Sequence, residues 1–363
     1  MEDYIWTVVG AGPAGIAAVG KLLDNGQNPE AIAWIDPLFR AGDLGAKWSN
    51  VSSNTKVSRF EAFLRDCESF NYSKTDAPFS IRRLDPNQTC QLYHIVEPLV
   101  WITDQLLKRV NSKKTKVLSL SFENMQWRVR VESEVITAKN VILAIGSKQK
   151  SLNYPKPEIT LEYALDRGKL QKRVDRDETI AVFGSSHSAI MAIHNLLCAG
   201  VRQVINFYRS PVRYAVDYGD WILYDNTGLK GETAAWARGN IEREDLKGLL
   251  RVEANPENIG AYLPRCSRVV YGVGFEARTI PIDGVNPAGY NEKTGEIVPG
   301  LFGCGIAFPE KITDRAGNIE YNVGILKFIK YLDRVVPKWI EATKPAIEEN
   351  RSEIQVLDDS PRN

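Results

Sequence analysis

The sequence predicts an α/β fold built on two βαβ units of the nucleotide-binding type. Two observations carry this prediction: an apolar run at residues 5–9 ends abruptly in Gly10-Ala11-Gly12-Pro13-Ala14-Gly15, and another at residues 179–183 ends in Gly184-Ser185-Ser186-His187-Ser188-Ala189. Each turn is followed by helix-forming residues and a further apolar run. Period-two alternation at residues 117–136 adds a small antiparallel β layer. The expected architecture is therefore two Rossmann-like dinucleotide-binding domains, one inserted in the other.

Composition narrows the class of protein. The 363 residues exceed one usual domain, and 44% hydrophobic with 25% charged residues is typical of a soluble globular chain. A net charge of +1 argues against nucleic acid or an anionic membrane as principal partner. No apolar span reaches 18 residues. The run at residues 8–19 is broken by glycines and follows an acidic start, so it predicts neither a signal peptide nor a membrane helix. A cytoplasmic location is expected.

The cysteines do not form a recognisable chemical pattern. They are five in number, far apart and never arranged as CxxC: Cys67, Cys90, Cys198, Cys266 and Cys304. This spacing supports no disulfide framework, no redox-active dithiol and no zinc site. No metal site is expected.

The first glycine turn has the residues that a dinucleotide needs. Gly10 permits the tight turn, Gly12 lets backbone N–H groups approach a pyrophosphate, and Gly15 lets the helix lie close to the strand. Pro13 and Ala14 begin that helix, whose N-terminus carries a partial positive charge.

A second apolar strand at residues 31–35 ends at Asp36. A carboxylate at this point accepts the hydroxyls of an adenosine ribose and repels a 2′-phosphate. FAD or NAD therefore fits the first unit, and NADP does not. The alternative is a glycine-rich helix start in some other α/β protein.

Residues 37–60 are rich in glycine, serine and asparagine and are expected to be a long connection that wraps a cofactor. Its candidate site residues are Gly45, Trp48, Asn54 and Thr55. The alternative is a solvated loop. A helix is expected at residues 96–110, and a buried strand at residues 141–145 contains Ala144 and stops at Gly146. It is expected to be the last strand of the first unit.

The second unit departs from the first at two positions. Ser186 replaces the second glycine, between Ser185 and the pair His187 and Ser188. Arg209 follows the strand at residues 204–208, where the first unit has its acid, and a guanidinium there would pair with the 2′-phosphate of NADPH. The alternative is a structural repeat without a phosphate site.

The expected domain division is discontinuous. Residues 1–152 and 296–340 form the FAD-binding domain, residues 153–295 the NAD(P)H-binding domain, and residues 341–363 a polar tail. Aromatic residues between 211 and 262 lack clean periodicity, which leaves open a substrate-side insertion or packed loops. A strand at residues 268–275 contains Gly274, a glycine-rich segment at residues 299–306 contains Gly305, and a last helix is expected at residues 323–335.

Together these motifs resemble those of flavoproteins with two dinucleotide-binding domains, and within them the flavin-containing and N-hydroxylating monooxygenases. The resemblance covers roughly residues 4–150 and 175–335. Several segments are similar to family motifs: Gly10, Gly12, Gly15 and Asp36 to the FAD fingerprint, Gly45 and Trp48 with residues 53–56 to the G-x-W loop and the Thr-Asn segment over the flavin, Ala144-Ile145-Gly146 to the Ala-Thr-Gly junction, residues 271–275 to its second copy, and residues 301–305 to the segment that meets the ribityl chain.

This sequence departs from the family pattern at two points. The F-x-G-x-x-x-H fingerprint is absent around residues 150–165, and Ile145 replaces the usual threonine. The absence of CxxC weighs against the thioredoxin reductase branch of this architecture.

The resemblance implies an FAD-dependent NAD(P)H oxidoreductase. NADPH would reduce the flavin, and O₂ would give a C4a-(hydro)peroxyflavin that hydroxylates a nucleophilic nitrogen- or sulfur-containing small molecule. Asn54, the candidate catalytic residue, would help to orient nicotinamide against flavin and keep water away; it could equally be a turn residue. Two alternatives are a flavin reductase or oxidase without substrate oxygenation and a catalytically idle FAD-binding protein. The expected partners are a small-molecule substrate and O₂, without nucleic acid or membrane, and a homodimer is a possible assembly.

Overall fold

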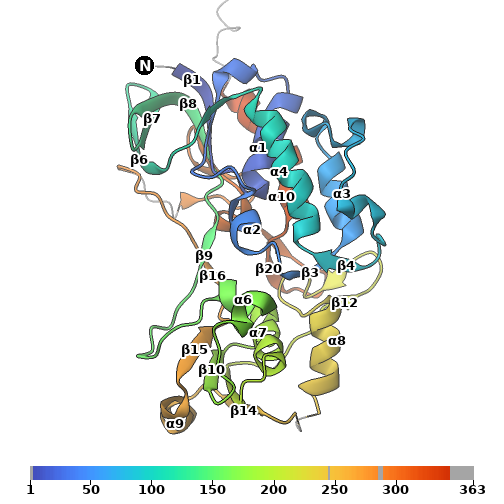
Figure 1. Cartoon of the computed structure of the whole chain (residues 1–363). Coiled ribbons are helices and arrows are strands. Elements are labelled where there is room, and N and C mark those ends of the chain that lie inside the picture. The colour runs from blue at the N-terminus through green and yellow to red at the C-terminus, as the bar shows by residue number, and fades with distance from the viewer. Residues whose placement is uncertain (1–2, 244–245, 285–288, 344–363) are drawn as a thin grey trace, which may run out of the picture.

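A computed structural model describes residues 3–243, 246–284 and 289–343, and its architecture is a mixed α/β fold with two large sheets (Figure 1). Over these residues no helix is long and apolar enough to cross a membrane.

The first sheet has eight strands around a parallel core in the order β5-β2-β1-β8-β18. β17 pairs antiparallel with β18 at one edge, and β6 and β7 form an antiparallel extension from β8. The bounds are β1 (Asp3–Val9), β2 (Ile32–Ile35), β5 (Asn111–Lys113), β6 (Val117–Glu123), β7 (Gln126–Val131), β8 (Val135–Leu143), β17 (Glu296–Val298) and β18 (Leu301–Gly303). Two expected fragments, at residues 135–136 and 141–145, are thus parts of one strand.

The continuity of β8 explains why the antiparallel layer is not separate from the first sheet. The first half of β8 pairs with β7 and its second half with β18. Asn140 interrupts the apolar pattern of the sequence between the two halves. Its side chain is nevertheless buried and donates to the carbonyl oxygen of Ile5 at 3.2 Å, so the strand continues through it.

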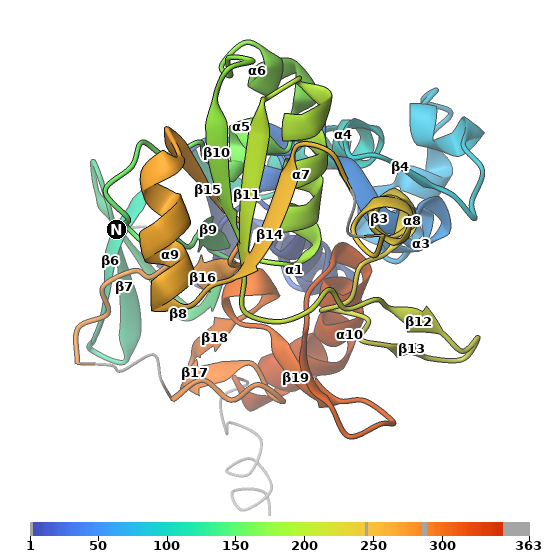
Figure 2. The same cartoon turned by 90° about the horizontal axis from the view of Figure 1, so that it is seen from below.

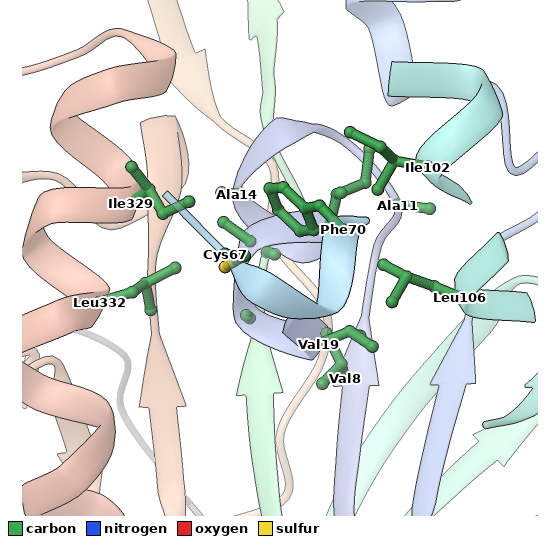
Figure 3. Packing of buried hydrophobic residues seen from close by; sticks show 14 of the residues in the cluster. Val8, Ala11, Ala14, Val19, Cys67, Phe70, Ile102, Leu106, Ile329 and Leu332 are labelled. Atoms are coloured by element: carbon green, nitrogen blue, oxygen red, sulfur yellow. The ribbon is translucent and has the colours of Figure 1, made fainter. Parts of the chain in front are cut away.

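One face of this sheet is covered by three helices, α1 (Pro13–Asp24), α4 (Tyr93–Leu107) and α10 (Ile325–Ala342) (Figure 1). Figure 3 shows the core between them, with Val8 from the sheet, Val19 from α1, Ile102 from α4 and Leu332 from α10. Phe70 fills the space beside α1 so closely that a Cβ on Gly20 would stand 2.6 Å from its ring. The helix that begins at the first glycine turn is therefore held on several sides.

The second sheet is parallel throughout, in the order β14-β11-β10-β15. Figure 2 shows α7 and α9 on opposite faces of it. The bounds are β10 (Thr179–Phe183), α7 (His187–Cys198), β11 (Gln203–Tyr208), α8 (Gly231–Asn240), β14 (Leu249–Glu253), α9 (Pro256–Tyr262) and β15 (Arg268–Tyr271), preceded by the short helices α5 (Leu161–Ala164) and α6 (Arg167–Gln171).

The chain crosses between the two sheets twice, and the crossings lie side by side. β9 (Ser147–Gln149) leads out and β16 (Phe275–Ala277) leads back, and they pair antiparallel (Figure 1). After β16 the chain rejoins the first sheet, where Leu120 donates its N–H to the carbonyl oxygen of Pro281 at 2.9 Å. The domain division at residues 152–153 and 295–296 stays a prediction.

Residues 37–60 are not one irregular connection, as the sequence suggested. They contain α2 (Gly42–Lys47) and β3 (Ser52–Lys56), and α3 (Val57–Arg65) begins directly afterwards. β3 pairs antiparallel with β4 (Thr89–Gln91). This partner is distant in sequence, so the composition of the segment alone does not predict the strand.

Two hairpins complete the fold. β12 (Val216–Asp217) pairs with β13 (Ile222–Leu223), and β19 (Glu310–Thr313) pairs with β20 (Ile319–Asn322). Their tips meet, because Arg315 of the second hairpin forms an ion pair with Asp220 of the first at 2.6 Å. The aromatic-rich region thus includes a hairpin that contacts the carboxyl-terminal part of the chain.

Candidate functional site

The first glycine turn joins β1 to α1, and two of its glycines cannot carry a side chain. Gly10 has φ +106°, and a Cβ there would stand 2.3 Å from the carbonyl oxygen of Ala144. A Cβ on Gly15 would stand 2.0 Å from the carbonyl oxygen of Gly10. The turn therefore brings the ends of β1 and β8 and the start of α1 within backbone contact.

The N-terminus of α1 is open to an anion. Gly12 is the N-cap, no side chain caps the helix, and its first turn contains no acidic residue. The nearest atom to a Cβ on Gly12 would be the Cα of Gly42, at 3.9 Å. Free N–H groups and the partial positive charge of the helix end would attract a phosphate here.

Asp36, directly after β2, is a buried carboxylate (8% exposed) that is already anchored to the backbone. Its Oδ2 accepts the N–H of Ala11 at 2.8 Å, and its Oδ1 accepts those of Leu38 at 2.8 Å and Phe39 at 2.7 Å. A carboxylate has about four acceptor positions, so roughly one remains. This geometry fits one ribose hydroxyl rather than the two expected from sequence.

Gly305, far along the chain, lies against the start of α1. It has φ +79°, and a Cβ on it would stand 2.6 Å from the Cβ of Ala14. The preceding residue, Cys304, donates its N–H to the carbonyl oxygen of Leu143 at 3.0 Å. The structure thus brings the carboxyl-terminal glycine segment, Ala144 and the first turn together.

Gly45 and Trp48 lie on α2 and at its end. A Cβ on Gly45 would stand 2.0 Å from the carbonyl oxygen of Arg40. The ring of Trp48 meets that of Phe275 edge to face, with the centroids 6.3 Å apart. Because Phe275 belongs to the returning crossing β16, Trp48 connects α2 to the junction between the two sheets.

Asn54 and Thr55 lie on β3, at the place where α8 approaches the first sheet. Asn54 is exposed, and its Oδ1 accepts the hydroxyl of Thr55 at 3.2 Å. The neighbouring Ser52 hydroxyl contacts a carboxylate oxygen of Glu232, on α8, at 3.2 Å. Asn54 therefore lies where elements of the two sheets meet, as a residue acting between two cofactors would.

The second turn repeats the geometry of the first. Gly184 has φ +115°, and its Cβ would stand 2.3 Å from the carbonyl oxygen of Gly272. Its N–H donates to Phe207 at 2.8 Å, as that of Gly10 does to Ile35 at 2.8 Å. The neighbouring strands also correspond: β1 lies between β2 and β8, and β10 lies between β11 and β15.

Ser185 and Ser186 direct their hydroxyls away from the start of α7. Ser186 is the N-cap, but its hydroxyl donates to the carbonyl oxygen of Gly272 at 3.1 Å and does not cap the helix. The hydroxyl of Ser185 donates to the carbonyl oxygen of Ser210 at 2.7 Å. The first turn of α7 contains no acidic residue and no side-chain cap, so it too can accept an anion.

The two units place their small residues in complementary positions. The first unit has Gly15 on α1 and Ala144 directly after β8. The second has Ala189 on α7 and Gly272 directly after β15. A Cβ on Gly272 would stand 2.6 Å from the Cα of Ala189. Each unit thus has room for one methyl group at this contact.

The sequence suggested that Arg209 stands at the position equivalent to Asp36, and this prediction is wrong. The strand registers pair Val9 with Ile35 and Phe183 with Phe207, so Tyr208 is the equivalent of Asp36 and Arg209 follows it. The connection from α7 to β11 is shorter than that from α1 to β2. Counting residues from the glycine turn therefore does not identify equivalent positions in the two units. Arg209 is exposed and has no hydrogen bond or ion pair with any residue that the structure describes.

His187 and Ser188 open α7, and both are half-buried. Burial, with the nearby Lys230 ammonium, lowers the pKa of His187 to about 4. Its Nε2 lies 3.4 Å from the hydroxyl of Thr233, on α8. The imidazole is therefore neutral at pH 7 and adds no charge to the turn.

Gly146 and Gly274 lie at the two crossings rather than in the turns. Both have positive φ, and Lys150 donates its N–H to the carbonyl oxygen of Gly274 at 3.1 Å. The sequence did not single out Arg278, which follows β16. Its guanidinium forms an ion pair with Asp43 of α2 and donates to the carbonyl oxygen of Ile145 at 3.3 Å. Only its position in the fold identifies it.

A polar network that the sequence also missed fixes residues 225–230. Burial would raise the pKa of Asp225, but hydrogen bonds from Lys230 and Lys327 outweigh it and lower the pKa. Glu320, on β20, is 3% exposed and accepts the N–H of Asn226 at 3.1 Å and the hydroxyl of Thr227 at 2.7 Å. No spacing in the sequence links these distant residues.

Within the described part of the chain, no group of three or more His, Cys, Asp or Glu side chains could hold a metal ion.

Comparison with known proteins agrees with this geometry. Residues 7–148 match the FAD-NAD(P)-binding family model. The chain is 34% identical over 383 aligned positions to the monooxygenase AgnR1 of Paecilomyces divaricatus, covering 92% of this chain and 97% of that protein.

Solved structures share the whole fold. The ornithine N-hydroxylase of Kutzneria sp. 744 matches with a TM-score of 0.68 and 10% identity, covering 94% of this chain and all of that one. The flavin-containing monooxygenase of Stenotrophomonas maltophilia matches with a TM-score of 0.63 and 12% identity, covering 95% and 100%. At such identities the likeness concerns the fold, and it confirms the expected class of two dinucleotide-binding domains.

Identity over nearly the whole length of AgnR1, together with the FAD-NAD(P)-binding match, confirms the expected enzyme class: the chain belongs to the family of FAD- and NAD(P)-binding monooxygenases that includes AgnR1.

Proposed function

We propose that the first βαβ unit (residues 3–36) binds FAD, that the second (residues 179–209) binds NADPH, and that the enzyme hydroxylates a nitrogen- or sulfur-containing small molecule with O₂. The observation that carries this proposal is the repeated turn geometry. Gly10 and Gly184 have the same contacts, and both following helices begin without a side-chain cap or an acid. Two anion sites of one design fit two dinucleotides.

On the FAD side, the residues present fit the cofactor. Gly12 and the N–H groups after Pro13 would hold the pyrophosphate, and the remaining acceptor position of Asp36 would take a ribose hydroxyl. Gly305 lies against Ala14 at the start of α1, and we assign it to the part of the site that follows the pyrophosphate.

Further along, we assign Gly45, Trp48 and Thr55 to the flavin end of this site. They lie on α2, at its end and on β3. These elements lead from the first turn toward the junction between the two sheets.

On the NADPH side, Arg209 is the residue that would read the 2′-phosphate. It is exposed and unpaired among the described residues, so binding would break no existing ion pair. Because His187 is neutral at pH 7, Arg209 would supply the positive charge that contacts the phosphate. Ser185, Ser186 and Ser188 line the turn that would take the pyrophosphate.

Bound FAD and NADPH supply hydride transfer and oxygen activation. The chain must align them and keep water from the reaction, and we assign Asn54 to this place because it lies on β3 where α8 meets the first sheet. Its exposed amide can donate and accept hydrogen bonds. Ala144, Gly146 and Gly274, at the strand end and the crossings, would allow close approach of the backbone.

The experiment compares oxygen balance across a panel of small amines and thioethers. Purified protein should contain noncovalent FAD, consume NADPH and O₂, and place one atom from ¹⁸O₂ in the product. NADPH consumption that yields only hydrogen peroxide with every panel compound would favour the reductase or oxidase alternative. A bound flavin reduced by neither nicotinamide would indicate an idle FAD-binding protein.

A cytoplasmic location and a homodimer stay predictions. Fractionation of the source cells and sedimentation analysis of the purified protein test them.

A further inference from the structure

Trp34 and Asn206 occupy the same position in the two βαβ units. Trp34, on β2, is the register partner of Val8, and Asn206, on β11, is the register partner of Val182. In each unit the first glycine of the turn comes two residues after that partner. Both side chains are fully buried.

Two unlike side chains make the same hydrogen bond from this position. The indole Nε1–H of Trp34 donates to the carbonyl oxygen of Gly10 at 2.9 Å. The amide Nδ2–H of Asn206 donates to the carbonyl oxygen of Gly184 at 2.8 Å. Nothing in the residue types predicts this equivalence, because it depends on strand register.

The bond determines which way the next peptide group faces. In a trans peptide the carbonyl oxygen and the following N–H point in opposite directions, so a carbonyl held toward the sheet turns the next N–H away from it. In the first unit that N–H, of Ala11, reaches Asp36 Oδ2 at 2.8 Å. In the second, the N–H of Ser185 has no partner among the residues described and can serve a ligand.

Glycine makes this orientation easy to lose. Without a Cβ, Gly10 and Gly184 can rotate about their backbone bonds at little steric cost. In the first unit a flipped peptide would break the hydrogen bond from the N–H of Ala11 to Asp36. In the second it would present a carbonyl oxygen to a bound phosphate in place of the N–H of Ser185. A side-chain donor beneath the glycine opposes this flip.

We propose that Trp34 and Asn206 are positioning residues: Trp34 holds the first turn in the conformation that binds FAD, and Asn206 holds the second in the conformation that binds NADPH. The proposal rests on the assignment of the two turns to these cofactors. It requires that loss of each donor weakens the cofactor of its own unit and leaves the other unchanged.

Asn206→Asp tests the second unit, and Asn195→Asp is its matched control. Asn206 donates to two carbonyl oxygens and accepts from Arg251 Nε at 2.9 Å. Buried Asn195, on α7, has the same pattern, with donations to Ala164 and Leu165 and acceptance from Arg167 Nε at 2.9 Å. Its partners lie outside the turn, so it measures the cost of losing a buried amide.

For Asn206→Asp we expect the Kd for NADP⁺, measured by calorimetry, and the KM for NADPH to rise about tenfold. The kcat at saturating NADPH and the FAD content should remain those of the wild type. Asn195→Asp should lower Tm comparably and leave the Kd unchanged. Asn206→Ser, which removes the amide without adding charge, repeats the test if the aspartate variant does not fold.

Trp34→Phe tests the first unit, with Trp6→Phe as its control. Trp6 is also a fully buried indole of this core, but its Nε1–H donates to Gln27 Oε1 at 2.8 Å, outside the turn. Trp34→Phe should raise the Kd for FAD about tenfold, measured from flavin fluorescence released on dilution, while Trp6→Phe retains flavin. The Kd for NADP⁺ should not change in either.

Equal losses in a variant and its control would reduce the role to packing and overturn the proposal, as would changes in both cofactors from one substitution. Wild-type protein that binds neither FAD nor NADP⁺ would instead refute the assignment of the turns. The two failures are therefore distinguishable.

Discussion

A Cβ on Gly272 would stand 2.6 Å from the Cα of Ala189, closer than such atoms approach in folded proteins. The contact joins the end of β15 to the first turn of α7. Since a backbone atom is involved, a side-chain rotation cannot relieve it, and the helix itself would have to move.

Gly272→Ala should therefore displace the start of α7 and weaken NADPH binding at least tenfold, with a loss of stability on the order of 1–3 kcal/mol. FAD content should be retained. Gly239→Ala is the control, because a Cβ at this position of α8 meets nothing within 4 Å and alanine favours a helix. Thermal unfolding and NADP⁺ calorimetry on both variants decide the matter; unchanged NADP⁺ affinity in Gly272→Ala would contradict the prediction.

Arg209→Ala should lower the affinity for NADPH roughly tenfold to a hundredfold and leave that for NADH almost unchanged. A guanidinium gives a phosphate charge-assisted hydrogen bonds worth about 1.5–3 kcal/mol, whereas a ribose hydroxyl needs no cation. Flavin reduction at varied NADPH and NADH measures the preference. Arg202→Ala removes the same charge at the other end of β11 and should have no effect; an equal loss in both variants would point to general electrostatic attraction.

His187 should make the protein sensitive to acid. Its pKa is about 4 in the folded chain and near 6.5 when unfolded, so the unfolded chain binds the extra proton between these values. The stabilisation is complete above pH 6.5 and is lost as the pH falls through 4, amounting to about 3 kcal/mol. Urea unfolding between pH 4 and 7 should show a steeper loss in the wild type than in His187→Gln. Parallel curves would mean that the imidazole titrates normally.

Glu320→Ala should loosen the attachment of residues 225–230 to the carboxyl-terminal part of the chain, where Lys327 would remain as a contact. The buried carboxylate is the acceptor for Asn226 and Thr227, and unsatisfied donors cost about 1–3 kcal/mol each. Limited proteolysis should cut this segment sooner than in the wild type. Glu310→Ala, on the partner strand of the same hairpin, loses contacts to Asn322 and Arg334 instead and should leave the segment protected.

Local patterns predicted the two turns because each depends on adjacent residues: an apolar strand, a glycine with positive φ and an uncapped helix. Features that depend on contacts between residues far apart in the sequence were not predicted. Arg209 was misplaced by one residue because register, not distance along the chain from Gly184, determines which side chain follows the strand. β3 was missed because its partner, β4, is remote in sequence, and Asn140 concealed the continuity of β8 because a polar side chain can be buried when the backbone accepts its hydrogen bond.

For Asn54, Trp48 and Gly305, the sequence predicted a place in the site but not the contacts that each residue makes, because a sequence motif identifies these residues but does not show which residues they contact in the folded chain. Arg278 and Glu320 show the reverse, because their contacts are evident only when the crossing and the hairpin are folded.

The paired crossings β9 and β16 also determine the order in which the chain can fold as it leaves the ribosome. Every strand of the second sheet has been synthesised once residue 271 has emerged, so that sheet can close on itself. The first sheet began earlier but still lacks β18, and α1 lacks its neighbour α10. The inserted unit therefore can be complete while the side of α1 that packs on α10 remains uncovered, which reverses the usual amino-terminal-first order of domain folding.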